Sequence, residues 1–97
     1  MVIDPEYKKR TNDLVVQSLE LYKSAGASQR ISDVWHAQRE GDFLCGFFVG
    51  EMIGSALSAF QTFHGREPTT QEHGEIVDII EVHATQIRDF FSKFNPN

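Results

Sequence analysis

The stretch from 43 to 64 reads FLCGFFVGEMIGSALSAFQTFH, and this stretch decides the fold. Its 22 residues contain one charged side chain, that of Glu51, although 24% of the whole chain is charged. A helix that is apolar on nearly every face must be covered on nearly every face. A protomer this small has few other helices to cover it, so we expect a homodimer or a higher oligomer.

A second long helix is predicted to follow this stretch. Gly65 is placed to end the first helix, and the sequence Thr69-Thr70-Gln71-Glu72 has the spacing of a capping box. Beyond it, a stripe recurs at alternating intervals of four and three residues, namely Ile76, Ile80, His83, Ile87, Phe90 and Phe94. This heptad spacing predicts an unbroken helix and an antiparallel helical hairpin of about 42–64 and 70–94.

The sequence before 43 predicts one long helix and one short helix. Asp4-Pro5 is a typical helix start, Gly26 a typical stop, and the helix between them is amphipathic. The segment 28–40 has about one apolar turn, and Gly41-Asp42 indicates a stop followed by a new N-cap. A kinked but continuous helix through this point is the alternative. The predicted fold is all-α, a small bundle of three long helices and one short helix.

Length, composition and charge narrow the class of protein. The 97 residues predict a single all-α domain spanning 1–97, and a lone cysteine excludes a disulfide within the chain. The N-terminal residues lack the basic and then apolar order of a secretion signal, so we expect a cytoplasmic protein. The net charge of −5 repels phosphate backbones, so we do not expect a nucleic-acid partner.

One turn resembles a known DNA-binding element. The sequence Gly65-Arg66-Glu67-Pro68-Thr69, with Glu72 after it, resembles over about eight residues the turn in a helical DNA-binding region of bacterial sigma factors. The resemblance implies DNA binding, but capping alone accounts for the threonine and the glutamate. A helix-turn-helix also needs a second break at a glycine-bearing turn, and Gly74 comes too early for it. The net negative charge and the unbroken apolar stripe of 76–94 therefore favour a helical hairpin over a DNA-binding helix-turn-helix.

Small residues fall in one row of the 43–64 helix, namely Gly46, Gly50, Gly54 and Ser58. Such a row lets another backbone approach closely, and we expect Ile80 and Ile87 of the hairpin to fill the space beside it. Residues 43–60 are about long enough to span a bilayer, but the carboxylate of Glu51 lies at their centre. We therefore do not expect a membrane partner.

The hairpin register also places Glu51 level with His83. A buried carboxylate without a partner is costly, so these two side chains are predicted to form a buried polar pair, either structural or part of a site. A metal- or haem-binding bundle protein built around this pair is the alternative function. His36, His64 and His73 are further candidate metal ligands.

The predicted function is a non-catalytic helical oligomerisation or protein-interaction module. The chain has no phosphate loop, nucleophile elbow or haem-attachment motif, so the sequence does not support an enzyme activity but leaves it open, and we expect no bound cofactor. Aromatic and methionine side chains are favoured at protein interfaces. The interface candidates of the central helix are Phe47, Phe48, Met52, Phe60 and Phe63.

Overall fold

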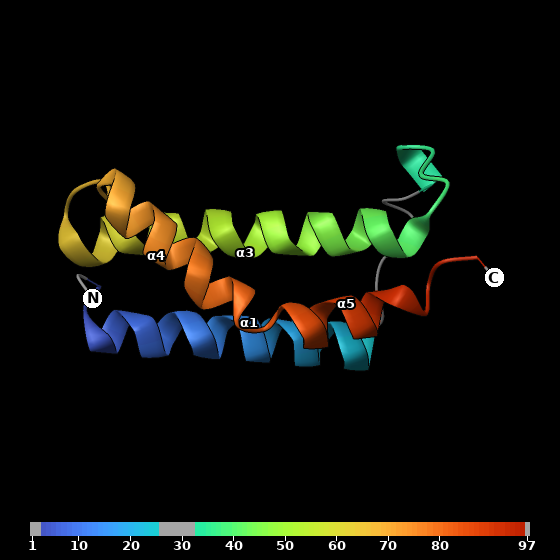
Figure 1. The fold of residues 1–97 in the computed structure, drawn as a ribbon, viewed down its shortest axis with the longest axis horizontal. Coiled ribbons are helices and arrows are strands. Elements are labelled where there is room, and N and C mark those ends of the chain that lie inside the picture. Colours follow the sequence, from blue (N-terminus) through green and yellow to red (C-terminus); the bar gives the residue numbers. More distant parts are fainter. Residues whose placement is uncertain (1–2, 26–32, 97) are drawn as a thin grey trace.

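The computed structural model describes residues 3–25 and 33–96, and it confirms the all-α bundle. The helices are α1 (Pro5–Ala25), α3 (Glu40–His64), α4 (Thr70–Glu81) and α5 (Ala84–Ser92). The described residues contain no strand. Helix α3 runs antiparallel to α1 on one side and to the α4–α5 segment on another, as Figure 1 shows.

Helix α1 begins as its sequence predicts. The side chain of Asp4 accepts hydrogen bonds from the backbone N–H groups of Glu6 and Tyr7, at 2.8 and 3.2 Å, and Pro5 takes the first helical position. The predicted amphipathic stripe is confirmed. Its buried members repeat at four-residue spacing as Tyr7, Thr11, Val15 and Leu19, with Leu14 and Tyr22 packed beside them.

Helix α3 begins earlier than predicted. Gly41 does not stop a helix and Asp42 is not an N-cap, because both lie in the first turn of α3, which follows Arg39 as N-cap. The reason is a non-local cap: the side chain of Asn95 accepts the Asp42 N–H at 3.1 Å and donates to its carboxylate at 3.0 Å. Asn95 therefore supplies hydrogen bonds to the first turn of the central helix.

The short helix predicted over 28–40 is described only in part, because 26–32 lie outside the described residues. Residues 33–34 are helical, and 35–39 form turns and bends in which His36 takes a left-handed φ of 55°. This non-helical stretch separates 33–34 from α3. The alternative of one continuous helix through Gly41 is therefore wrong.

The hairpin turn follows its local signals. Gly65 ends α3 with a φ of 67°, and its N–H donates to the Gln61 carbonyl at 2.8 Å. The capping box is present: Thr69 Oγ1 accepts the Glu72 N–H at 3.1 Å, and the Glu72 carboxylate accepts the Thr69 N–H at 2.9 Å. The predicted antiparallel hairpin is confirmed.

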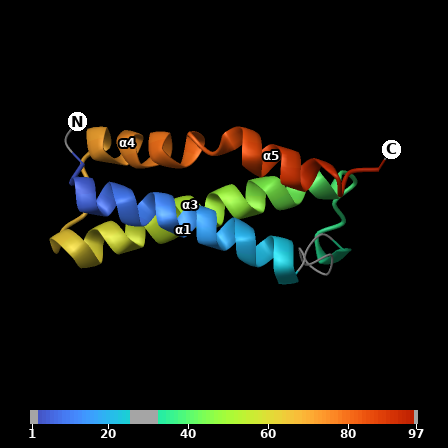
Figure 2. The same ribbon diagram turned by 90° about the horizontal axis from the view of Figure 1, so that it is seen from below.

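The helix predicted to run unbroken to 94 is interrupted at Val82 and His83. There the His83 N–H bonds to the Ile80 carbonyl, three residues back instead of four, and the His83 side chain contacts Asn12 of α1. Helices α4 and α5 still run end to end (Figure 2). The bend lets α4 pack on both α1 and α3, while α5 follows α3.

Candidate functional site

Helix α3 buries one row of side chains and exposes the opposite one. The buried row is Gly41, Leu44, Phe48, Met52, Ala56 and Phe60. Phe48, Met52 and Phe60 are thus core residues of the protomer, which removes them from the interface candidates. Phe47 and Phe63 keep about two fifths of their surface exposed, at 40% and 39%.

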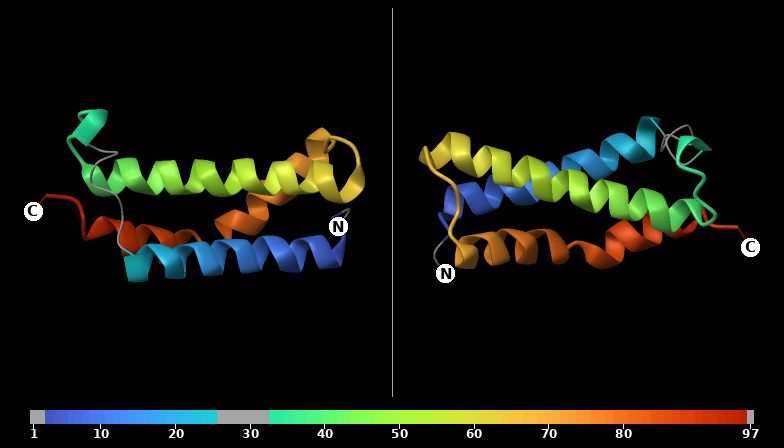
Figure 3. Two further views of the ribbon diagram at one scale, coloured as in Figure 1. Left: turned by 180° about the vertical axis from the view of Figure 1, so that it is seen from behind. Right: turned by 90° about the horizontal axis from the view of Figure 1, so that it is seen from above.

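The row of small residues faces solvent. A Cβ added at Gly46, Gly50 or Gly54 would meet no heavy atom of the described structure within 4 Å. The predicted close packing of Ile80 and Ile87 on this row is therefore wrong, and both isoleucines lie in the core formed with the larger side chains. The physical reason is that burying the aromatic and aliphatic row removes far more apolar surface from water. No other described helix covers this side of α3 (Figure 3).

Glu51 and His83 do not form the predicted buried pair. Glu51 is exposed, and its carboxylate accepts a hydrogen bond from the Tyr22 hydroxyl at 3.0 Å. Burial of Tyr22, together with this carboxylate, raises the pKa of the phenol to about 12. His83 is half-buried, and its Nε2 lies 2.8 Å from Asn12 Oδ1. Each of the two therefore finds its own partner on α1.

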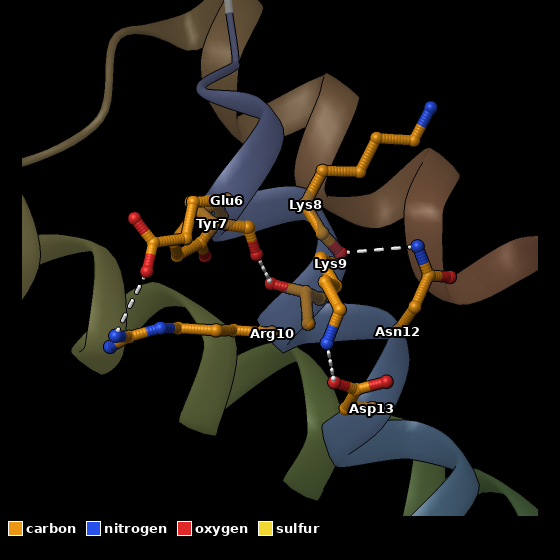
Figure 4. Close-up of polar contacts among 8 residues, drawn as sticks. Glu6, Tyr7, Lys8, Lys9, Arg10, Asn12 and Asp13 are labelled. Carbon is orange, nitrogen blue, oxygen red and sulfur yellow. Dashed lines mark hydrogen bonds and ion pairs between the residues drawn. The ribbon is translucent and has the colours of Figure 1, made fainter.

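The Asn12 amide has a fixed orientation. Its Nδ2 donates to the Lys8 carbonyl at 3.1 Å, which leaves Oδ1 to face His83, as Figure 4 shows for the α1 side of this contact. An amide oxygen only accepts, so the Nε2 of His83 carries the hydrogen. The arrangement ties the α4–α5 break to the middle of α1.

The three histidines considered as metal ligands lie in different surroundings. His36 is exposed in a turn, and His73 is exposed on α4. His64 packs against the rings of Tyr7, Phe60 and Phe63, and its buried Nε2 has no hydrogen-bond partner among the described residues. Within 3–25 and 33–96, no group of three or more histidine, cysteine or acidic side chains is placed to hold a metal ion. The metal or haem alternative thus loses the Glu51–His83 pairing on which it depended.

An open groove runs between α1 and the flank of α3 that faces it. Its volume is about 670 Å³. Mostly large side chains line it from α1, and mostly small ones line it from α3, with Phe63 at one end. They include Tyr7, Arg10 and Leu14 on α1 and Ser55, Ser58 and Ala59 on α3. The guanidinium of Arg10 lies 5.4 Å from the centre of the Phe63 ring at one end. Sequence reasoning missed this groove because it is formed by two helices distant in the sequence.

Two properties set α3 apart from the other described helices. By length and composition the helix is apolar enough to cross a membrane, yet only 28% of its most apolar 18 residues are buried. Between Phe43 and Phe60 the only charged side chain is Glu51, which Tyr22 holds. We call the uncharged exposed residues on this side the α3 face: Gly46, Phe47, Gly50, Gly54, Ser55, Ser58 and Ala59; the exposed Glu51 lies among them.

Comparison of the chain with protein-family models, with curated proteins and with solved structures found no match. The class of the molecule is therefore that of its own architecture, a small all-α bundle with one uncovered apolar helix. Its function is argued from the α3 face.

Proposed function

We propose that the chain is a non-catalytic homodimerisation module, and that two copies associate through the α3 face. The observation that carries the proposal is the exposure of this apolar helix. A soluble monomer rarely leaves a continuous apolar surface uncovered, and such surfaces mark interaction sites. Helix α3 is sparsely buried and carries few charges, and its row of small residues lies on the exposed side.

The exposed area of the protomer agrees with a missing partner. The chain exposes 6297 Å² at a mass of 11.0 kDa. A folded monomer of that mass exposes roughly 5,600 Å². The excess of roughly 700 Å² is of the same order as the ~800 Å² that each partner contributes to an interface of standard size. A second copy on the α3 face would bring the exposed area per protomer to the usual value.

Charge favours this face over the others. Each copy carries a net charge of −5, so two copies repel where their acidic surfaces meet. The α3 face is made of uncharged residues, and the one charged side chain among them, that of Glu51, is hydrogen-bonded to the Tyr22 hydroxyl. Association through the α3 face therefore brings together fewer charges than association through the acidic surfaces would, and Glu51 is the one carboxylate of α3 beside the contact.

The small residues make close approach of two α3 helices feasible. Gly46, Gly50, Gly54 and Ser58 present almost no side-chain volume along about three helical turns. Helix pairs with such rows bring their backbones into contact, which gains dispersion attraction in addition to apolar burial. A bulky side chain in this row should separate the helices without disturbing the protomer.

The test uses Gly50→Leu and Gly54→Leu, with Gly74→Leu as the matched control. All three glycines lie in helices, and a Cβ at each meets no described heavy atom within 4 Å. Sedimentation velocity at micromolar concentration should give a dimer for the native chain and for the control, and a monomer for the two α3 variants. Circular dichroism checks that all remain folded. A native monomer, or α3 variants that stay dimeric, would overturn the proposal.

A lipid bilayer is the other occupant that the experiment must detect. Helix α3 has the length and composition to enter one. In a flotation gradient with phosphatidylcholine vesicles, the native chain should stay at the bottom, apart from the vesicles, if the α3 face is covered by a second copy. Co-flotation of the native chain would contradict the proposed dimer.

A further inference from the structure

We propose that the dimer is antiparallel, and that Phe47 of each copy enters the groove between α1 and α3 of the other. This inference rests on the proposed dimer and adds its geometry. The relevant observation is that an exposed aromatic side chain and an open groove lie on the same flank of one helix.

Phe47 projects from a surface of small residues. Its neighbours in the outward row are Gly46 and Gly50, which have no side chains to cover it, and it keeps 40% of its surface exposed. Positions four residues apart share a side of a helix, so Phe47 belongs with Glu51, Ser55 and Ala59. Glu51 bonds to Tyr22 of α1, and Ser55 and Ala59 line the groove. Phe47 therefore lies on the flank of α3 that faces α1.

Symmetry decides which flanks can meet. In an antiparallel pair of helices the two-fold axis is perpendicular to both, and it places each flank against the same flank of the partner. In a parallel pair the axis runs along the helices and places the α1 flank against the opposite flank. Only the antiparallel pair brings Phe47 of one copy to the groove of the other.

The row of small residues also fixes the height of the contact. Its midpoint lies level with Met52, and an axis at that height sets Gly46 opposite Ser58 and Gly50 opposite Gly54 of the other copy. Phe47 then falls level with position 57 of the partner helix, because both helices rise 1.5 Å per residue. On the α1 flank this height lies between Ser55 and Ala59, which both line the groove.

The groove suits an aromatic side chain. Its exposed lining is mostly apolar, with the ring of Tyr7 and the side chain of Leu14 on one wall and the short side chains of α3 on the other. The Tyr7 hydroxyl is already bonded to the Ala56 carbonyl and the Thr11 hydroxyl to the Tyr7 carbonyl. A phenyl ring can therefore fill the space without leaving these polar groups unpaired. The two contacts are identical by symmetry, so each copy both provides and receives one ring.

The experiment is a complementation of two variants. Phe47→Ala removes the ring, and Ser55→Phe fills the groove of its own chain. Each variant alone should weaken the homodimer about tenfold or more, as expected for loss of a central aromatic contact. Mixed together they should form a heterodimer of nearly native affinity. In that heterodimer the filled groove faces the missing ring, and the intact ring faces the intact groove. Native mass spectrometry separates the three dimers by mass.

Val82→Ala is the control for loss of an exposed apolar side chain, because Val82 is 79% exposed and lies at the α4–α5 break, away from α3's outward side. It should dimerise like the native chain and give no preference for a heterodimer with Ser55→Phe. A native dimer whose affinity is unchanged by Phe47→Ala, or a mixture that shows no heterodimer preference, would overturn this geometry while leaving dimerisation intact. A native monomer would overturn both.

Discussion

Gly41 lies so close to the carbonyl oxygen of Phe91 that an added Cβ would overlap that oxygen. The same Cβ would lie 2.7 Å from the side-chain oxygen of Asn95, which accepts the Asp42 N–H. The contact joins the start of α3 to the end of α5. One end of the bundle is therefore closed by backbone packing that requires glycine.

We predict that Gly41→Ala lowers the free energy of unfolding by about 1–3 kcal/mol, the usual cost of forcing atoms into a filled site. Urea denaturation measures the change. Gly74→Ala is the control: it lies in α4 with open space around its Cβ, and should raise stability by up to ~1 kcal/mol. Equal stability of Gly41→Ala and the native chain would show that this end of the bundle is loosely packed.

The capping box predicts an acid-dependent part of stability. Hydrogen bonds from Arg66, at 2.8 and 2.9 Å, and from the Thr69 backbone lower the pKa of Glu72 from 4.5 to about 2. A carboxyl whose pKa is lowered by folding stabilises the folded state above its unfolded pKa. That stabilisation is lost as the pH falls from about 4.5 towards 2.

We therefore expect Glu72→Gln to flatten the fall in stability over this acid range, because glutamine keeps an acceptor for the capping box but does not titrate. Urea midpoints measured from neutral pH downward give the slope. Arg66→Gln should flatten the same limb, since the guanidinium is the main cause of the lowered pKa. An acid limb in Glu72→Gln as steep as the native one would contradict this origin.

Local signals explain why much of the fold could be predicted from the sequence. The start of α1 depends on Asp4 and Pro5, and the hairpin turn on Gly65 and the capping box, all within a few residues of the backbone groups they serve. The heptad stripe of 76–94 identified the side that enters the core. In each of these elements the interacting groups lie within a few residues of one another, so the local sequence is enough to predict them.

The rotation of α3 could not be predicted in the same way. Its rows are all apolar or small, so the periodicity does not say which row meets the other helices. The choice depends on how Phe48 and Met52 fit against side chains of α1 and α5. The start of α3 is likewise set by Asn95, 53 residues away. No proline or glycine near Val82 indicates the break between α4 and α5. The groove beside Ser55 forms only when α1 packs against α3.

Glu51 should contribute little to stability, contrary to what a buried pair would require. We expect Glu51→Ala to cost less than ~1 kcal/mol, because an exposed carboxylate exchanges its hydrogen bond for water. Tyr22→Phe should behave alike, whereas Tyr22→Ala should cost more, since the ring packs edge-on against Phe48 and Phe91.

The Glu51→Ala variant can also be tested through the pKa of Tyr22. Removing the carboxylate of Glu51 should lower the pKa of Tyr22 from about 12 towards its ordinary value, because the negative charge and the accepted hydrogen bond both favour the protonated phenol. An NMR titration of the tyrosine rings follows this group separately from Tyr7. A large loss of stability in Glu51→Ala, or an unchanged Tyr22 pKa, would mean that the carboxylate is engaged elsewhere.

The contact between Asn12 and His83 links the α4–α5 break to α1. Its geometry also indicates which imidazole nitrogen of His83 carries the hydrogen. Because Asn12 Nδ2 donates to the Lys8 carbonyl, Asn12 Oδ1 must accept from His83 Nε2. We predict that neutral His83 is present as the Nε2–H tautomer. Nitrogen chemical shifts of the imidazole, measured at a pH where the ring is neutral, report this directly.

The energetic coupling of the two side chains should be about 1 kcal/mol, as for a partly buried neutral hydrogen bond. A double-mutant cycle with Asn12→Ala and His83→Ala measures it. Asn12→Asp keeps the acceptor facing Nε2 and should retain the tautomer, whereas Asn12→Ala should release it. If the Nδ1–H tautomer dominates in the native chain, the amide of Asn12 must be turned the other way: its Nδ2 would then donate to His83 Nε2, and its hydrogen bond to the Lys8 carbonyl would be lost.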